Sequence, residues 1–474
     1  MSSTRTYSLR PRMLNPGMVK VAVLLGLAVG MMLCPSFGER WRDAQNLRAK
    51  ESLLPAAPAA ASAEAPIVTM MAAALPANDE DLFMGPQTPA GAVPEDITIS
   101  VQGDDTQVTP GVLDLTVAVE EDGHLVQDMG KGRKVFYTVD ARLQSTMADL
   151  VEAYEPPFAS VVVMEPSTGR ILAMVDYASI EELKGQPLSL RAEVPAASIF
   201  KIVSSAALLE SGRVSTDTPV CYSGGRNRIT RRHLRYDPER DRTCKDMTHA
   251  LASSSNPVFA RLTNRYLDAT DLQRTADRFG FNQTLPFLWP AQSGTAKIPT
   301  DELELARCSA GFGHTHLSPL HAALMVSAVG NQGTMMAPVI VDRIEDSGES
   351  KYTWKPSVLA QVTSPEVAAT IAEMMVGTTK EGTAAKYFRK ANAQLRKIDV
   401  SGKTGSLNGE VAGEVWNFSW FVGFAPAVTP QVAVAVMVAN EPRWKVKSTY
   451  LAREAFETYF AGVTVPAVAS SDLP

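Results

Sequence analysis

A serine and a lysine three residues apart have the types and the spacing needed for nucleophilic catalysis. Ser198 and Lys201 lie in the apolar stretch VPAASIFKIVSS. Residues three apart share one face of a helix, and a serine hydroxyl needs a base close by to act as a nucleophile. A lysine amine can be that base when burial and a neighbouring cation lower its pKa. Because the spacing alone is close to chance, an ordinary buried helix carrying two polar residues stays open.

A second motif combines a hydroxyl with a carboxamide. Ser254 and Asn256 stand two residues apart in HALASSSNPVFARL, just before a proline. On a bend, both side chains can face one cleft, where the serine passes a proton and the asparagine holds a substrate amide. The alternative is a helix cap or a turn, which serine and asparagine commonly form before proline.

A third motif, SGKTGS, places Lys403 and Thr404 between two glycines in a strand-like context. Glycines in a strand allow a ligand to approach the backbone closely, and the lysine suits an anionic group of that ligand. The alternative is a β-bulge or a turn. Each motif is weak alone, so the combination of the three matters more than any one of them.

The motifs S-x-x-K, S-x-N and K-T-G, in this order, resemble the signature of the penicillin-binding proteins and serine β-lactamases. Further stretches resemble the transpeptidase domains of this superfamily, namely PSTGRILAMV, GFGHTHLSPLHAALMVSAVGNQG and FSWFVGFAP. The resemblance covers roughly residues 135–462. The chain departs from the common pattern at Ala197, where many relatives have glycine, and at Ser406, where many have threonine. Neither change removes a reacting group.

The resemblance implies a role for each motif residue. Ser198 would be the acylated nucleophile and Lys201 its base, although the proton acceptor is disputed within the superfamily. Lys403 would support the electrostatics of the site and lower the pKa of Lys201. The remaining implied roles are a proton shuttle to the leaving amine at Ser254, a hold on the peptide backbone at Asn256, substrate binding at Thr404, Gly405 and Ser406, and an oxyanion hole made by the backbone N–H groups of Ser198 and Ser406.

The elements that must position these residues can be read from periodicity. Asp140 is placed to cap a helix whose apolar residues share one face, namely Leu143, Met147, Leu150, Val151 and Tyr154. The runs ASVVVME and RILAMVDYA, joined by PSTGR with Gly169 at the turn, predict a hairpin. A helix is expected from Ser198 to about Glu210, followed by a mixed, helix-rich region over residues 213–310.

Near the C-terminus, three strands are expected in RKIDVSGKTGS, WNFSWFVGFAP and QVAVAVMVANEP, and a closing helix in STYLAREAFETYF. Strands, then helices, then strands and a helix predict an α+β fold. Its central sheet would be mainly antiparallel, flanked by helices, and interrupted by an inserted all-helical subdomain. This is the β-lactamase and transpeptidase type of fold that the resemblance implies.

The N-terminal part predicts a membrane anchor. Residues 1–20 are basic, and residues 21–37 form an apolar run that is slightly short of the roughly 30 Å needed to cross a bilayer. Lys20 can snorkel toward the headgroups, and the basic side should stay in the cytoplasm. A cleaved signal peptide is the alternative, but CPSFGER offers no small-x-small site. We expect a single-pass protein of the inner membrane with a periplasmic catalytic domain.

The remaining organisation follows composition. Residues 38–96 are rich in alanine and proline and predict a tether. Residues 97–134 predict a short β-rich segment, residues 135–463 the penicillin-binding transpeptidase domain, and residues 464–474 a tail. Cys221 and Cys244 either form a disulfide across one loop or stay free thiols.

Other features have simpler explanations. A net charge of −6 over 474 residues gives no indication of nucleic-acid binding. His314, His316 and His321 make no convincing metal set, and no cofactor motif is present. The basic run RNRITRRHLRYDPERDR is expected to be a solvated loop, with contact to anionic lipid or glycan-linked substrate as the alternative.

The expected activity is a peptidoglycan D,D-transpeptidase that crosslinks stem peptides through a serine acyl-enzyme and is inhibited by β-lactams. By resemblance, a membrane glycosyltransferase is the expected partner. A D,D-carboxypeptidase would use the same residues with water as acceptor. Two further functions stay open, namely a β-lactamase, with Glu302 of ELELA as deacylation base, and a non-enzymatic β-lactam sensor.

Overall fold

The computed structural model describes residues 99–100, 107–108 and 113–461. The expected basic tail at residues 1–20, anchor at residues 21–37, tether at residues 38–96 and tail at residues 464–474 all lie outside the described residues. None of the helices in the described part combines the length and the apolar composition that a membrane span requires.

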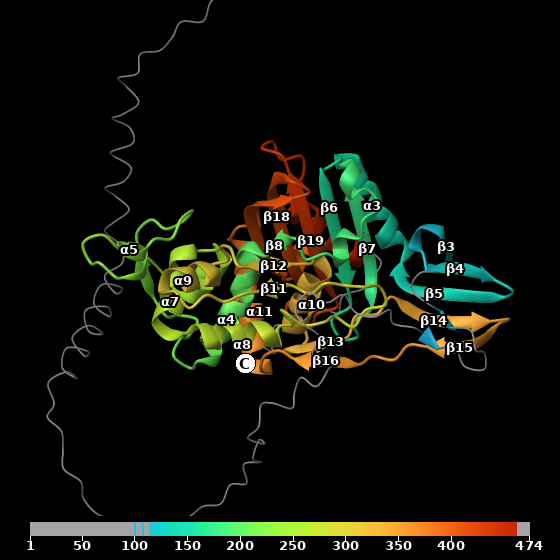
Figure 1. The fold of residues 1–474 in the computed structure, drawn as a ribbon, viewed down its shortest axis with the longest axis horizontal. Helices are drawn as coiled ribbons and strands as arrows, with labels where there is room; N and C mark the ends of the chain where they lie inside the picture. The colour runs from blue at the N-terminus through green and yellow to red at the C-terminus, as the bar shows by residue number, and fades with distance from the viewer. Residues whose placement is uncertain (1–98, 101–106, 109–112, 462–474) are drawn as a thin grey trace, which may run out of the picture. The chain divides into compact units, whose positions relative to one another are not determined.

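The central element is a five-stranded antiparallel sheet whose strands come from both ends of the described chain (Figure 1). Its order is β17 (Ser401–Val411), β18 (Glu414–Ala425), β19 (Val432–Asn440), β6 (Phe158–Met164) and β7 (Ile171–Ala178). The predicted hairpin is β6–β7, and Gly169 in its turn has a φ of +83°. β17, which carries the K-T-G motif, is an edge strand.

Alternation of side chains divides the core between the two faces of this sheet. In β19, Val434 and Val436 pack on one face, whereas Ala435 and Met437 pack on the other. All nine residues of the strand are buried, because helices cover both sides. A strand buried on both faces has an almost continuous apolar sequence, which explains the run QVAVAVMVA.

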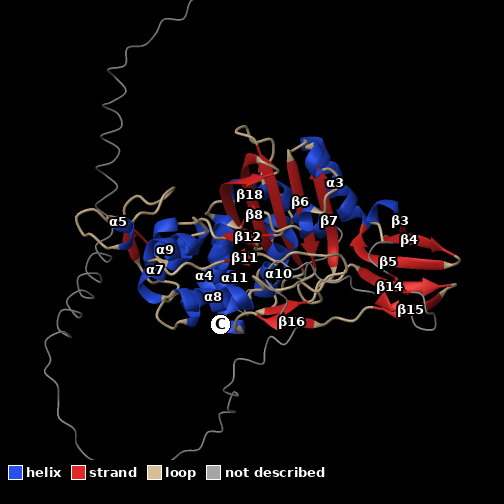
Figure 2. Cartoon of the chain, viewed as in Figure 1, coloured by secondary structure: helices blue, strands red, loops and turns tan. Residues whose placement is uncertain are grey.

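The helices stand on the two faces of the sheet (Figure 2). α3 (Ala141–Tyr154) and α13 (Ser448–Ala461) pack together on one side, and α10 (Pro319–Gly330) and α11 (Pro365–Lys380) pack on the other. Asp140 caps α3 by accepting the N–H of Leu143 at 2.7 Å, as predicted. The predicted α+β class with an antiparallel sheet is confirmed.

The segment between β7 and β17 holds the remaining helices. They are α4 (Lys201–Glu210), α5 (Arg231–Leu234), α6 (Met247–Ala252), α7 (Asn256–Tyr266), α8 (Ala269–Arg278), α9 (Glu302–Ser309) and α12 (Ala385–Phe388). Short strands also occur here, so this part is mainly rather than entirely helical. They are β8 (Val194–Pro195), β9 (Val220–Tyr222), β10 (Thr243–Lys245), β11 (Thr295–Ala296), β12 (Thr315–Leu317), β13 (Thr334–Met336) and β16 (Val358–Gln361).

A second antiparallel sheet lies on the other side of the main sheet from α5, α7 and α9 (Figure 1). Its order is β15 (Glu349–Thr353), β14 (Val341–Asp346), β5 (Arg133–Asp140), β4 (His124–Gly130) and β3 (Val119–Glu121). Two further strands, β1 (Ile99–Ser100) and β2 (Gln107–Val108), pair with each other. The predicted β-rich segment therefore contributes β3 and β4, and the boundary expected after residue 134 falls inside β5.

His321 is a structural residue of α10. Its side chain is fully buried, its Nδ1 accepts the N–H of Gly294 at 2.7 Å, and its Nε2 lies 2.7 Å from the carbonyl oxygen of Phe279. A neutral imidazole with one acceptor and one donor nitrogen satisfies both contacts. Burial lowers the pKa of His321 to about 4, so the folded state holds this side chain neutral.

The stability of the folded chain should therefore fall in acid partly through His321. Its pKa is about 4 when folded and about 6.5 when unfolded, so its contribution is complete above about pH 6.5 and is lost as the pH falls toward 4. We expect acidification from pH 7 to pH 5 to cost about 2 kcal/mol through this residue. Denaturant unfolding of wild type and His321→Gln at both pH values checks this. Equal pH dependence of the two proteins would contradict it.

Candidate active site

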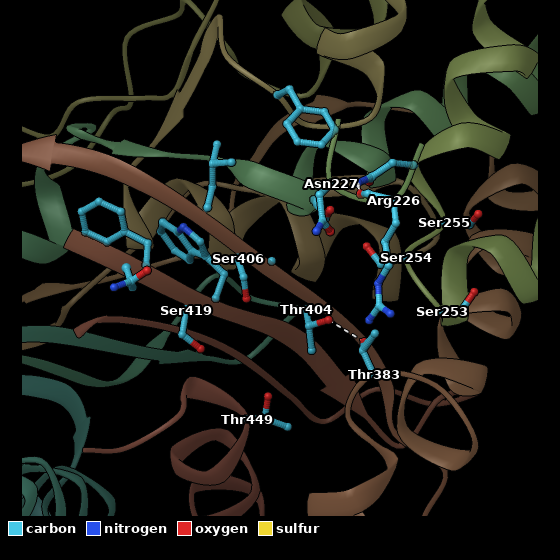
Figure 3. Close-up of a pocket in the computed structure, with 18 of the residues that line it drawn as sticks. Arg226, Asn227, Ser253, Ser254, Ser255, Thr383, Thr404, Ser406, Ser419 and Thr449 are labelled. Carbon is cyan, nitrogen blue, oxygen red and sulfur yellow. Dashed lines mark hydrogen bonds between the residues drawn. The ribbon is translucent and has the colours of Figure 1, made fainter. Parts of the chain in front are cut away.

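The three sequence motifs meet at one cleft of about 1240 Å³ beside the edge strand β17. Figure 3 shows Ser254, Thr404 and Ser406 from two of these motifs in the cleft. Residues of each motif line it, namely Ser198, Ser254, Asn256, Thr404, Gly405 and Ser406. Lys201 and Lys403 lie beneath the cleft, fully buried, and reach it through hydrogen bonds. Residues separated by some 50 and 150 positions along the chain are thus paired in two hydrogen-bonded groups, Lys201 with Asn256 and Lys403 with Ser254.

Ser198 lies on a short 3₁₀ turn (Ala197–Phe200) that leads into α4, so Lys201 is the first residue of the α-helix. The preceding Ala197 has a φ of +49°, in the left-handed region that favours glycine. This is the position where many relatives have glycine. The turn packs closely against two glycines, Gly311 and Gly405. A Cβ added to Gly311 would lie 2.1 Å from the Ala197 carbonyl oxygen, and one added to Gly405 would lie 3.3 Å from the Ala197 Cβ. Close packing on both sides therefore holds the nucleophile turn.

The Lys201 amine is surrounded by three oxygen atoms. Its Nζ lies 2.8 Å from Ser198 Oγ, 2.7 Å from Asn256 Oδ1 and 2.5 Å from the Ala310 carbonyl oxygen. The carboxamide and carbonyl oxygens can only accept hydrogen bonds. A neutral amine has two N–H groups for these two acceptors, which leaves its lone pair for the hydroxyl of Ser198. This arrangement matches a base poised to take the serine proton.

Burial also favours the neutral form of both lysines. Desolvation lowers the pKa of Lys201 well below its ordinary value, and the nearby charge of Lys403 lowers it further. Burial lowers the pKa of Lys403 to about 7. Lys403 Nζ lies 3.0 Å from Ser254 Oγ and 2.7 Å from the Thr404 carbonyl oxygen, so it connects the K-T-G strand to the S-x-N motif.

The S-x-N motif lies at the start of α7. Ser254 has a φ of +55°, and Asn256 is the first residue of the helix. The Asn256 carboxamide is held from both ends: its Oδ1 accepts from Lys201, and its Nδ2 donates to the Arg226 carbonyl oxygen at 2.5 Å. A bend and a helix start are therefore both present at this motif, and they serve to orient these two side chains.

β17 pairs with β18 in an unbroken register from Ser401 to Val411. The alternative of a β-bulge or turn at SGKTGS is therefore wrong. Gly402 is required by packing, because a Cβ there would stand 2.8 Å from the Phe421 ring. Thr404 Oγ1 lies 2.5 Å from Thr383 Oγ1 (Figure 3), and the Ser406 side chain is exposed to the cleft.

The other predicted residues have these positions. Cys221 and Cys244 form a disulfide between β9 and β10, and Cys308 is a buried free thiol. Glu302 is exposed on α9, does not line the cleft, and lies 3.9 Å from Arg231 Nη1. In the described part of the chain, no group of three potential metal ligands is close enough to hold an ion.

Sequence reasoning missed three contributors to the site. Ala310 acts through its backbone carbonyl, which every residue has, so its side chain gives no signal. Thr383 and Arg226 join the cleft from loops far from the motifs in sequence. The sequence contains one indication of Arg226, namely the arginine-rich run to which it belongs. That run has no fixed spacing to the motifs.

Comparison with known proteins agrees with the geometry. The family model for the penicillin-binding protein transpeptidase domain matches residues 159–458. The chain is 28% identical over 346 residues to the peptidoglycan D,D-transpeptidase PbpA of Mycobacterium tuberculosis, which covers 65% of this chain and 68% of that protein.

Solved structures show the same fold. The D,D-transpeptidase domain of a peptidoglycan glycosyltransferase from Eggerthella lenta is similar with a TM-score of 0.58 and 25% identity, over 77% of this chain and 95% of that one. The penicillin G acyl-enzyme complex of penicillin-binding protein A from M. tuberculosis has a TM-score of 0.52 and 25% identity, over 69% of this chain and 80% of that one. The family model spans more than half of the chain and includes all three motifs of the cleft, so the chain belongs to the family of penicillin-binding protein transpeptidase domains.

Proposed function

We propose that this chain is a peptidoglycan D,D-transpeptidase that works through an acyl-enzyme on Ser198. The observation that carries the proposal is the environment of Lys201, whose Nζ lies 2.8 Å from Ser198 Oγ and within 2.7 Å of two oxygens that only accept hydrogen bonds. A buried, neutral amine at this distance is the base that a serine nucleophile requires. The relatives named above are a D,D-transpeptidase and a protein acylated by penicillin G.

The first half-reaction forms the acyl-enzyme. Ser198 Oγ attacks the carbonyl carbon of the peptide bond between the two terminal D-alanines, and its proton passes to Lys201 Nζ. The N–H groups of Ser198 and Ser406 stabilise the negative charge that develops on the carbonyl oxygen. The C–N bond then breaks, Ser254 gives its proton to the leaving nitrogen, and D-alanine departs. Lys403, 3.0 Å from Ser254 Oγ, can return that proton when it is charged.

In the second half-reaction an amine of a neighbouring stem peptide attacks the ester. The nitrogen loses a proton, Ser198 regains one, and a new amide joins the two stems. If water attacks instead, the enzyme is a D,D-carboxypeptidase. Product analysis with a stem peptide and an acceptor amine separates the two, since crosslinking gives a product heavier than the donor and trimming gives a lighter one.

A β-lactamase is disfavoured by the position of Glu302. A deacylating carboxylate must reach the water that attacks the ester, but Glu302 is exposed on α9, outside the cleft residues, beside Arg231. In addition, the residues that line the cleft in the described part include no aspartate or glutamate. A penicillin adduct should therefore persist rather than turn over. The complete set of reacting groups also disfavours a non-enzymatic sensor.

Substitution of the two serines of the oxyanion hole should give different results. Ser198→Ala removes the nucleophile and should abolish the covalent penicillin adduct, as measured by intact mass after incubation with a fluorescent penicillin. Ser406→Ala keeps its backbone N–H, so its acylation rate should fall much less than the roughly 10²–10³-fold that follows loss of an oxyanion donor. An adduct on the Ser198→Ala protein would show that another residue is the nucleophile.

The pH profile of acylation should report the pKa of Lys201. The rate rises with pH as Lys201 loses its proton, because only the neutral amine accepts the proton of Ser198. Since the charge of Lys403 lowers the pKa of Lys201, Lys403→Met should move this acid limb to higher pH, whereas Lys403→Arg should move it less. Stopped-flow acylation by a chromogenic β-lactam over about pH 5–9 measures the limb. A shift of the Lys403→Met limb to lower pH would contradict the assignment.

We also propose that residues 21–37 anchor the chain in the inner membrane with the catalytic domain outside the cytoplasm. The support is the apolar run itself and the basic residues before it. The proposed partner is a membrane glycosyltransferase that supplies nascent glycan strands. Full-length protein should stay in the membrane pellet after a carbonate wash, and a chain without residues 1–37 should be released. Release of the full-length chain, or cleavage near residue 37, would contradict the anchor.

A further inference from the structure

Three cationic side chains line the catalytic cleft, and no carboxylate of the described residues lines it with them. The three side chains are those of Arg226, Lys245 and Lys447. None of the three forms an ion pair with a described residue. A cleft lined by charges of one sign concentrates ligands of the opposite sign. The net charge of the whole chain is −6, so a preference for anions must come from this local arrangement.

Arg226 lies on the loop between β9 and β10, and buried contacts hold this loop in place. The Cys221–Cys244 disulfide joins the two strands. The buried side chain of Arg261, on α7, donates to the carbonyl oxygens of Cys221 and, at 2.9 Å, of Arg235, and it forms a 2.7 Å ion pair with Asp241. The Asp241 side chain is itself fully buried (0% exposed). Arg226 therefore lies at the rim of the cleft, on a loop that these contacts hold in place.

The other two cations are also fixed. Lys245 Nζ donates to Ser253 Oγ at 2.6 Å, next to the proposed proton shuttle Ser254. Lys447 Nζ lies over the Trp444 ring at 4.6 Å from its centroid. Lys245 belongs to β10 in the helical part, whereas Lys447 directly precedes α13 at the main sheet. The positive charge is therefore spread along the cleft rather than gathered at one point.

The C-terminal carboxylate of a D-Ala-D-Ala stem is expected at Thr404 and Ser406 on β17, and it is compact compared with a cleft of about 1240 Å³. The three lining cations, Arg226, Lys245 and Lys447, then remain for other groups of the substrate. We propose, resting on the proposed function, that this cleft selects acyl donors with a second, side-chain carboxylate before the D-Ala-D-Ala end, and that Arg226 is the principal residue that recognises it.

The test compares two peptides that differ in one group. Both end in D-Ala-D-Ala, and the preceding residue carries either a free side-chain carboxylate or its carboxamide. D-alanine release is measured with the full-length protein as kcat/KM, because both crosslinking and trimming release it. We expect wild type to prefer the carboxylate peptide by about tenfold at low salt, with a smaller preference at high ionic strength because salt screens exposed charges.

The variants assign the preference to one side chain. Arg226→Gln should remove most of it while retaining the backbone carbonyl that holds Asn256. Arg228→Gln is the matched control, since Arg228 is exposed on the same loop but does not line the cleft, and it should keep the full preference. Equal kcat/KM for the two peptides in wild type, or an unchanged preference in Arg226→Gln, would overturn the inference alone. No D-alanine from either peptide, with no Ser198-dependent penicillin adduct, would overturn the proposed function as well.

Discussion

The structure of this site depends on the burial of one lysine amine. Lys201 Nζ has no access to water, so its charged form is disfavoured, and its contacts must come from the protein. Two of these contacts are oxygens that only accept, at Asn256 and Ala310. The third is the hydroxyl of Ser198. In its neutral form this amine can donate to the two acceptors and take the proton of Ser198.

Each of these partners is placed by a different part of the fold. The S-x-x-K turn packs between β17 and Gly311, the S-x-N motif begins α7, and Lys403 extends from an edge strand of the main sheet. The sheet is buried on both faces and is therefore the rigid element against which the helical part is set. Backbone conformations that cost free energy occur at Ser254 and at Ala197, which directly precedes the nucleophile Ser198. Packing from both sides holds the turn at Ala197.

The loop between β9 and β10 connects catalysis with recognition. Its Arg226 carbonyl orients the Asn256 carboxamide, and its Arg226 side chain lines the cleft. The ion pair of Arg261 and Asp241 is buried, so loss of either partner would leave an uncompensated buried charge. The basic run over residues 226–242 was expected to be a solvated loop, and most of its arginines are indeed exposed. One of them, Arg226, nevertheless lines the catalytic cleft.

The sequence by itself determined the fold class, the strands that flank the motifs, and which serine, lysine and asparagine residues form the site, because hydrophobic periodicity and ordered motifs are local properties of a chain. It left open whether SGKTGS was a strand or a bulge and whether Cys221 paired with Cys244. Only the tertiary structure brought in the Ala310 carbonyl, Thr383 and Arg226, and only it lowered the pKa of Lys201. The pKa of Lys201 is lowered by burial and by the charge of Lys403, and both depend on which atoms surround Lys201 in space. The three-residue spacing between Ser198 and Lys201 carries no information about those atoms.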